Sequence, residues 1–251
     1  MRKIKIREFF DKIASEIFVD KYNCIVCDIE LRKQSKYGLC DECKSKLTFI
    51  KDNVCKKCGR LQHDEADYCL TCQEHKREFD FARSCAVYDD VAKEIVRGIK
   101  FGGKKYFAKY MANFLVDRYK DTFENVSIDV VVPVPLTKKK KIERGYNQSW
   151  EIAKEFAKAV DLTADDSVAV KIKETQEQAR LSGKEREDNI KGAFEVKNLE
   201  IIKDKSVLII DDVMTTGSTA SEIARILKKA KAKHVYLLTF ASTKYKVEED
   251  K

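Results

Sequence analysis

The residues best suited to chemistry lie in one segment, Val207–Thr219, which reads Val-Leu-Ile-Ile-Asp-Asp-Val-Met-Thr-Thr-Gly-Ser-Thr. Its hydroxyls, with the backbone N–H groups of a helix that starts there, make a phosphate cradle, and Gly217 lets the backbone approach the ligand closely. Asp211 and Asp212 would repel phosphate, but their carboxylates can accept hydrogen bonds from two sugar hydroxyls, directly or through a metal's water shell. The segment therefore predicts a site for a phosphorylated ribose. The alternative interpretation is a strand that ends in a polar helix cap.

A second segment, Val131–Pro135, contains the only two prolines of the chain and follows an apolar run. Because proline cannot donate to a sheet, we expect the strand to end here in a stiff turn that presents backbone N–H groups to a second anion. Lys138–Lys141 follow, and a solvated charged loop is the alternative for this lysine run. Arg144 and Asn147, beside a glycine, are the stronger site candidates.

A third segment, Thr175–Phe194, is long and polar and lies between two predicted strands. This character is typical of an active-site lid, in which Arg180, Lys184 and Arg186 could clamp a pyrophosphate on closure. A surface helix with ordinary salt bridges is the alternative. Lys100, just before a predicted helix end, could also face the site.

Eight of the nine cysteines form four Cys-x-x-Cys pairs separated by 12, 11 and 10 residues. The pairs are Cys24 with Cys27, Cys40 with Cys43, Cys55 with Cys58, and Cys69 with Cys72. Two such pairs complete the closed four-thiolate coordination of structural zinc, and the metal would supply folding free energy that so small a segment lacks. Sequential pairing into two zinc sites is the simplest arrangement. Interleaved pairing, disulfides, iron–sulfur ligation and ligation by His63 or His75 are the alternatives, while Cys85 is expected to be a buried thiol.

From about residue 80, strand-like and helical runs alternate along the chain. The strand-like runs are Ala82–Tyr88, Ile128–Val134, Val168–Ile172, Val207–Ile210 and Val235–Ala241, and the helical runs lie near Asp90–Phe101, Lys105–Lys120, Asn147–Val160 and Ser218–Lys231. This alternation predicts an α/β domain with a parallel sheet flanked by helices. Ligands of such sheets bind at the carboxyl ends of the strands, where the three polar segments follow.

The chain of 251 residues suits one α/β domain with a small accessory domain. We expect an amphipathic helix over residues 1–22, a double zinc ribbon over 23–76, the α/β domain over 80–245 and a charged tail over 246–251. The first helix is expected to dock on the protein body, with a membrane-surface or partner-binding helix as the alternative. Charges interrupt its apolar positions, so it is not a secretory signal, and no transmembrane run is present, which predicts a cytoplasmic protein. The net charge of +8 suits phosphate-bearing ligands or nucleic acid.

Val207–Thr219 resembles, at every position, the signature that binds 5-phosphoribosyl-1-pyrophosphate (PRPP) in type I phosphoribosyltransferases. Three further features narrow the resemblance. They are Val132–Leu136 with Arg144–Gln148, the pattern of Thr175, Gln178, Leu181, Arg186, Asn189, Gly192 and Phe194, and the cysteine-rich start. Together they are similar to the ComF family, whose members join a double zinc ribbon to a phosphoribosyltransferase-like domain and are linked to bacterial natural transformation. The resemblance covers roughly residues 20 to 242.

The resemblance implies a role for each segment. Asp211 and Asp212 would bind the ribose hydroxyls of PRPP, and they form the expected catalytic set with Arg180, Lys184 and Arg186. The other expected PRPP-binding residues are Val134, Pro135, Arg144, Met214, Thr215, Thr216, Gly217, Ser218 and Thr219, of which the last five would hold the 5-phosphate. Mg2+ would bridge the pyrophosphate and ribose oxygens, and two Zn2+ ions would be structural.

No purine- or pyrimidine-selective motif is present, so two functions stay open. The first is transfer of phosphoribose from PRPP to an unknown acceptor, with a role in DNA uptake. The second is a non-catalytic, PRPP-sensing zinc protein that binds single-stranded DNA. PRPP, single-stranded DNA and DNA-uptake proteins are therefore the expected partners.

Overall fold

The computed structural model describes residues 22–62, 65–175 and 189–244 of the chain. The predicted N-terminal helix, apart from its last residue Tyr22, and the charged tail lie outside the described residues. So do His63 and the three predicted lid residues Arg180, Lys184 and Arg186. No helix of the described part is long and apolar enough to cross a membrane.

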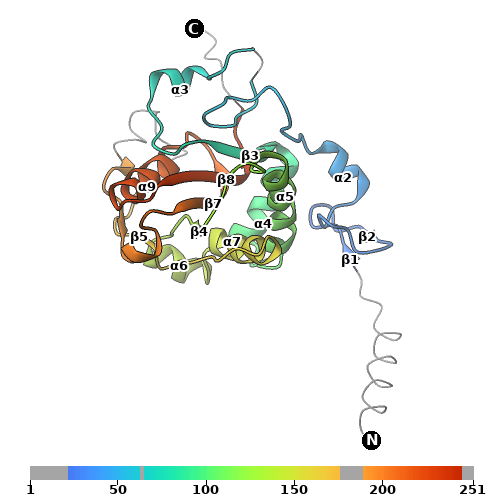
Figure 1. The fold of residues 1–251 in the computed structure, drawn as a ribbon. Helices are drawn as coiled ribbons and strands as arrows, with labels where there is room; N and C mark the ends of the chain where they lie inside the picture. Colours follow the sequence, from blue (N-terminus) through green and yellow to red (C-terminus); the bar gives the residue numbers. More distant parts are fainter. Residues whose placement is uncertain (1–21, 63–64, 176–188, 245–251) are drawn as a thin grey trace, which may run out of the picture.

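Four parallel strands form the central sheet, in the order β3-β8-β7-β4 (Figure 1). Their bounds are Ala82–Val87 for β3, His234–Ser242 for β8, Ser206–Met214 for β7 and Val130–Pro133 for β4. The predicted parallel sheet is therefore confirmed. Its two interior strands, β7 and β8, are the longest, and β7 carries the carboxylates.

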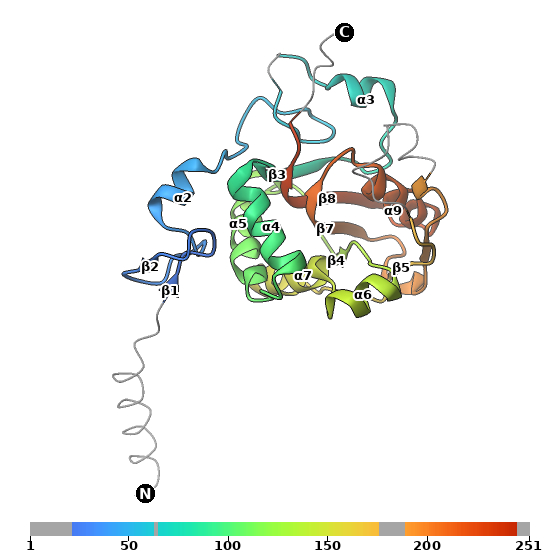
Figure 2. The same ribbon diagram turned by 180° about the vertical axis from the view of Figure 1, so that it is seen from behind.

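Both faces of the sheet are buried. Successive side chains along one strand point to opposite faces, and each face packs into its own core. In β7, Leu208 and Ile210 join the core beneath α4, α5 and α7, whereas Val207 and Ile209 join the core beneath α9. The helices span Asp90–Phe101 (α4), Phe107–Thr122 (α5), Gln148–Ala159 (α7) and Ser218–Lys229 (α9). Figure 2 shows α4, α5 and α7 on one side of the sheet and α9 on the other.

Two stretches differ from the sequence-based expectation. Val168–Ile172 does not enter the parallel sheet: β5 (Ala169–Lys171) pairs antiparallel with β6 (Phe194–Val196) in a separate two-stranded sheet. Val168 and Ala169 are buried, but Val170 and Lys171 are only half-buried and Ile172 is exposed, so this run does not have the two covered faces of an interior parallel strand. The run Lys138–Lys141 is no loop but opens α6 (Lys138–Arg144), which is capped by the Thr137 side chain.

The zinc-ribbon segment covers the open edge of β3. The Val87 N–H donates to the Thr48 carbonyl (2.8 Å), the Ile50 N–H to the Cys85 carbonyl (2.9 Å), and the Ala82 N–H to the Lys57 carbonyl (2.8 Å). These bonds satisfy backbone groups that an edge strand would otherwise expose. The segment before β3 is therefore part of the sheet as well as a metal-binding unit.

Two small subdomains carry the cysteines. The first contains β1 (Tyr22–Asn23), β2 (Glu30–Leu31) and α2 (Asp41–Lys46), and the second contains α3 (Leu70–Glu74). The first docks on α5 through a stacked Tyr37–Phe114 pair with ring centroids 4.2 Å apart. A 3-10 turn, η2 (Leu199–Ile201), links β6 to β7.

The second subdomain presses against β3 at Gly59, whose φ is +67°. A Cβ at this position would lie 2.3 Å from the Ala82 carbonyl oxygen. Glycine is therefore required at this position for two reasons: the backbone is left-handed, and two chain segments approach each other closely.

Candidate functional site

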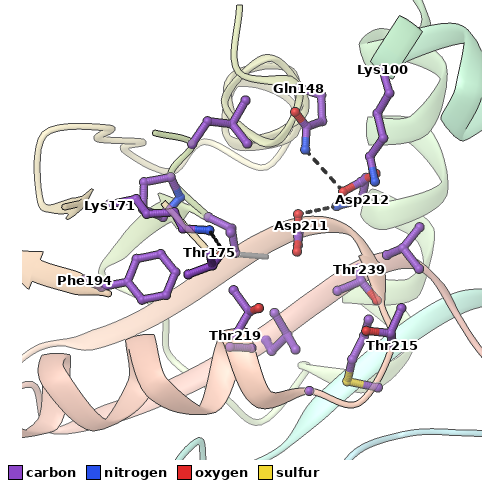
Figure 3. Close-up of a pocket in the computed structure, with 18 of the residues that line it drawn as sticks. Lys100, Gln148, Lys171, Thr175, Phe194, Asp211, Asp212, Thr215, Thr219 and Thr239 are labelled. Atoms are coloured by element: carbon purple, nitrogen blue, oxygen red, sulfur yellow. Dashed lines mark hydrogen bonds and ion pairs between the residues drawn. The ribbon is translucent and has the colours of Figure 1, made fainter. Parts of the chain in front are cut away.

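A cavity of about 370 Å³ opens at the carboxyl ends of β4, β7 and β8. Its walls are the turn Val134–Leu136, the segment Asp211–Thr215 and the first residues of α9, with Lys100 and Lys171 among the remaining lining residues (Figure 3). The first two polar segments singled out in the sequence, and the end residues Thr175 and Phe194 of the third, therefore border one space, as expected for a parallel sheet.

Asp212 is only 2% exposed and forms an ion pair with Lys100, whose Nζ lies 2.5 Å from Asp212 Oδ2. Gln148 Nε2 donates a longer hydrogen bond, 3.4 Å, to Asp212 Oδ1. A carboxylate this deeply buried needs such a partner, because an unpaired buried charge is strongly destabilising.

Asp211 faces the cavity from the same strand. Ser149 Oγ and the backbone N–H of Asp212 both donate to Asp211 Oδ1, at 2.7 and 2.9 Å. Both bonds end on one oxygen, so Oδ2 remains the atom that can receive a ligand hydroxyl or a metal-bound water.

Local packing explains why Lys100 points at the carboxylates. Gly98 lets the ring of Phe107 lie against α4, where a Cβ would sit 2.2 Å from Phe107 Cε2. The Tyr146 hydroxyl donates to the Ile99 carbonyl at 2.5 Å and holds the last turn of the helix in place. Lys100 therefore projects from a turn that is fixed on two sides.

The N-terminus of α7 is fixed in a similar way. The Asn147 side chain accepts a hydrogen bond from the Ser149 N–H (3.1 Å) and donates one to the Val134 carbonyl (3.0 Å). One residue thus caps the helix and ties it to the turn after β4. This arrangement aims Gln148 and Ser149 at the two carboxylates.

The two carboxyl groups titrate differently. Burial, followed by the adjacent charge of Asp212, raises the pKa of Asp211 to about 8. Burial also acts to raise the pKa of Asp212, but the Lys100 ammonium and the hydrogen bonds to this carboxylate together lower it below its usual value. In the ligand-free protein, Asp212 is therefore the ionised partner of Lys100, and Asp211 readily holds a proton.

The predicted phosphate cradle begins α9. Gly217 occupies the N-cap position with φ +81°, and the hydroxyls of Thr216 and Ser218 lie 2.8 Å apart. Thr215, Gly217 and Thr219 line the cavity, whereas Thr216 and Ser218 stabilise the turn. The first turn of a helix leaves N–H groups without intrahelical partners, so this end of the cavity suits an anion.

The remaining predicted residues divide into two groups. Val134, Pro135 and Met214 line the cavity. Arg144 is not among the lining residues: its guanidinium donates to Gln148 Oε1 and lies 5.4 Å from the ring centroid of Phe101. Its contact with a cavity-lining residue is the hydrogen bond to Gln148.

Sequence reasoning missed Ser149, Lys171 and Thr239, which contact a carboxylate or line the cavity, whereas Lys140 of the lysine run Lys138–Lys141 lines it as well. The strand register places Thr239 of β8 opposite Asp211. A lysine at the end of an otherwise apolar run was the only sequence signal for Lys171. Strand β7 also runs past the predicted end at Ile210 to Met214, so that both carboxylates lie on the strand itself.

The cysteines form two groups, Cys24, Cys27, Cys40 and Cys43, and Cys55, Cys58, Cys69 and Cys72. In each group the Sγ atoms lie within 4.8 Å of one another, with 3.7 Å between Cys27 and Cys40 and 3.6 Å between Cys58 and Cys69. A tetrahedral site with Zn–S bonds of about 2.3 Å requires roughly 3.8 Å between sulfurs, so both groups fit zinc. The sequential arrangement is the one that the structure assembles, neither group includes His75, and Cys85 is buried apart from both.

Comparison with known proteins agrees with this two-part organisation. Residues 115–251 match the model of the phosphoribosyl transferase domain family, and residues 18–73 match that of the double zinc ribbon domain. Competence protein F from Haemophilus influenzae is 27% identical over 215 residues, which cover 83% of this chain and 91% of that protein. Competence protein ComFC from Bacillus subtilis is 29% identical over 241 residues, which cover 88% of this chain and 95% of that protein. DNA utilization protein YhgH from Escherichia coli K12 is 26% identical over 208 residues, which cover 81% of this chain and 89% of that protein.

The cysteine groups predict the zinc content of the purified full chain. We expect two zinc ions per chain by elemental mass spectrometry, and one in either Cys24→Ser with Cys27→Ser or Cys55→Ser with Cys58→Ser, because each change removes half of one ligand set. Cys85→Ser serves as the control and should retain two. One zinc in the unsubstituted protein, or iron in its place, would contradict the assignment.

The raised pKa of Asp211 predicts a pH-dependent stability of the ligand-free protein. The unfolded chain releases this proton near pH 3.9, whereas the folded protein retains it to about pH 8. The stabilisation is therefore complete below about pH 4. It falls by at most about 1.4 kcal/mol per pH unit between about pH 4 and pH 8, and it is lost once the pH has risen through 8. Urea unfolding in Mg2+-free buffer from pH 6 to 8.5 should show a fall in stability that Asp211→Asn lacks and Asp165→Asn retains. Parallel profiles for all three proteins would refute the assignment.

Proposed function

The chain belongs to the phosphoribosyl transferase domain family, and we propose that it binds PRPP with Mg2+ in the cavity at the carboxyl ends of β4, β7 and β8. One observation carries this proposal: the Asp211–Asp212 pair and the Thr215–Thr219 turn face the same cavity. The carboxylates suit a ribose diol, and the helix N-terminus suits a phosphate. Ribose 5-phosphate carries a diol and a phosphate on one molecule, so it can bind to the carboxylates and to the helix N-terminus at the same time.

In this proposal PRPP spans the cavity. Its 5-phosphate lies against Thr215, Gly217 and Thr219, and its ribose hydroxyls meet Asp211. Its pyrophosphate lies toward Pro135 and the lysines Lys140 and Lys171, which line the same space. Lys100 keeps Asp212 ionised. The pair therefore holds at most the one proton on Asp211, and Asp212 stays negatively charged although it is buried.

The site also suits Mg2+. This ion prefers oxygen ligands and keeps several waters, so that one carboxylate together with ligand oxygens is enough to hold it. Asp212 Oδ2 is already paired with Lys100, which makes Asp211 the carboxylate with an oxygen available. When bound, Mg2+ would neutralise charge on the pyrophosphate.

We further propose that the protein transfers phosphoribose. The lone pair of an acceptor atom forms a bond to C1 of the ribose while the C1–O bond to pyrophosphate breaks. The electron pair of that bond leaves on the pyrophosphate, and the acceptor atom gives its proton to solvent. Lys140 and Lys171 are positioned to stabilise the departing charge, and Arg180, Lys184 and Arg186 remain candidates for the same role.

We propose a role in DNA uptake or use, which the names of the relatives support. We further propose that the protein acts in the cytoplasm, where thiols remain reduced for zinc. A second candidate is a non-catalytic PRPP-sensing protein that binds single-stranded DNA and acts with DNA-uptake proteins. The observation that favours it is α6, which presents Lys138, Lys139 and Lys141 on its exposed surface.

PRPP binding can be tested by calorimetry with Mg2+ present. Replacing both carboxylates, Asp211→Asn with Asp212→Asn, should weaken PRPP binding about 100-fold or more, because the carboxyl oxygen that receives the ribose hydroxyls and the negative charge of the pair are both lost. Asp165→Asn with Asp166→Asn, a neighbouring acid pair outside this cavity, is the matched control and should bind PRPP as the unsubstituted protein does. Equal PRPP affinity of the first variant and the control would rule out the proposed ligand site.

Turnover can be tested by following pyrophosphate release while bases, nucleosides and nucleic-acid ends are offered as acceptors. We expect release with one acceptor class, and none from the Asp211→Asn with Asp212→Asn variant. If the protein binds PRPP but releases no pyrophosphate with any acceptor, the non-catalytic candidate would be favoured. That candidate predicts single-stranded DNA binding that falls steeply with salt and survives the double substitution.

A further inference from the structure

A second cavity, of about 760 Å³, lies next to the first. It is formed by the turn after β4, the start of α6 and strand β5. Pro135, Leu136 and Lys171 line both cavities, so that the two spaces share one wall. The second cavity is therefore placed where a second ligand would lie beside the proposed PRPP site.

The second cavity is strongly basic. Six lysines line it, against the two carboxylates of Asp166 and Glu174. The six are Lys138, Lys139, Lys141, Lys171, Lys173 and Lys197. Lys141 approaches Asp166 only to 3.8 Å, and Lys197 pairs with Glu195 at 2.8 Å. Among the described residues, the other four lysines form no ion pair with a carboxylate, which leaves their charge available to an anion.

Lys171 stands in the shared wall. Its Nζ donates to Thr175 Oγ1 at 2.7 Å and lies 5.5 Å from the ring centroid of Phe194. Burial, followed by the nearby charge of Lys140, lowers its pKa. A partly desolvated ammonium without a carboxylate partner gains stability when an anion approaches, and here an anion could approach from either cavity.

The rest of the lining suits the non-anionic part of a ligand. Leu136, Ala169, Val170 and Ile172 provide apolar surface, and Ile172 is 56% exposed. An apolar surface beside convergent lysines matches a molecule that carries a phosphate on an organic body. The volume is within the range of about 300–1,000 Å³ found for small-molecule sites.

We propose that this second cavity binds the phosphate group of a second ligand, either a nucleotide or the phosphorylated end of a nucleic-acid strand, beside the bound PRPP. This inference rests on the proposed function, in which the second ligand is the acceptor. The acceptor of this protein would then differ from a free nucleobase in carrying its own negative charge, which the lysines recognise.

The test measures two affinities on the full zinc-loaded chain. The probes are a nucleoside 5′-monophosphate and a 5′-phosphorylated strand of about ten thymidines, each titrated with PRPP and Mg2+ present and absent. The variant Lys138→Gln, Lys139→Gln, Lys173→Gln removes three charges that line only the second cavity. The matched control, Lys158→Gln, Lys229→Gln, Lys233→Gln, removes three exposed charges that line neither cavity.

We expect at least one probe to bind, and to bind tenfold or more weakly to the first variant, while the control changes its affinity less than threefold. PRPP affinity should be unchanged in both variants. Equal affinity for the two probes identifies a nucleotide, and preference for the 5′-phosphorylated strand over the same strand without its 5′-phosphate identifies a nucleic-acid end.

Three results would overturn the proposal: no binding of either probe at low salt, equal weakening by the control, or a parallel loss of PRPP affinity, which would make the second cavity part of the PRPP site. Failure of the proposed function is distinguishable, because PRPP would then not bind while probe binding still depended on Lys138, Lys139 and Lys173.

Discussion

Two adjacent carboxylates at the end of the central strand are the constraint around which the site is built. Two adjacent carboxylates in a buried setting do not both ionise readily: Lys100, 2.5 Å from Asp212, keeps that carboxylate ionised, while the pKa of Asp211 is raised. This pairing requires the last turn of α4 and the first turn of α7 to meet at the carboxyl end of β7. Gly98, Tyr146 and Asn147 secure those two turns, so the packing of the helices and the electrostatics of the site depend on each other.

The zinc-ribbon segment serves the same sheet from its opposite edge. Its backbone hydrogen bonds from Thr48–Ile50 and Lys57 close the open side of β3, so the segment that carries the cysteine groups also completes the sheet. None of the eight cysteines that form the two groups lines the ligand cavity. The two cysteine groups therefore belong to the scaffold, apart from the cavity at the strand ends.

The distribution of charge around those strand ends points to anionic ligands. Lys100 lies on one side of the carboxylates and Lys171 on the other (Figure 3), and further lysines continue past Lys171 into the second cavity. Of the described lysines that line the two cavities, Lys100 is the one whose carboxylate partner is buried. Among the described residues, Lys138, Lys139, Lys171 and Lys173 form no ion pair with a carboxylate, and their charge is the physical basis for the proposed second phosphate site.

The sequence by itself determined the features that depend on residues close together in the chain. The four-cysteine groups arise from adjacent Cys-x-x-Cys pairs, the phosphate turn from five consecutive residues, and the parallel sheet from alternating strand and helix patterns. Only the tertiary structure decided that Lys100 pairs with Asp212, that Arg144 turns to Gln148, that Lys171 stands between two cavities and that β5 leaves the main sheet. Hydrophobic periodicity states which face of an element is buried, but not which distant element covers it. Contacts between residues far apart in the chain, such as Lys100 and Asp212, are set by that packing.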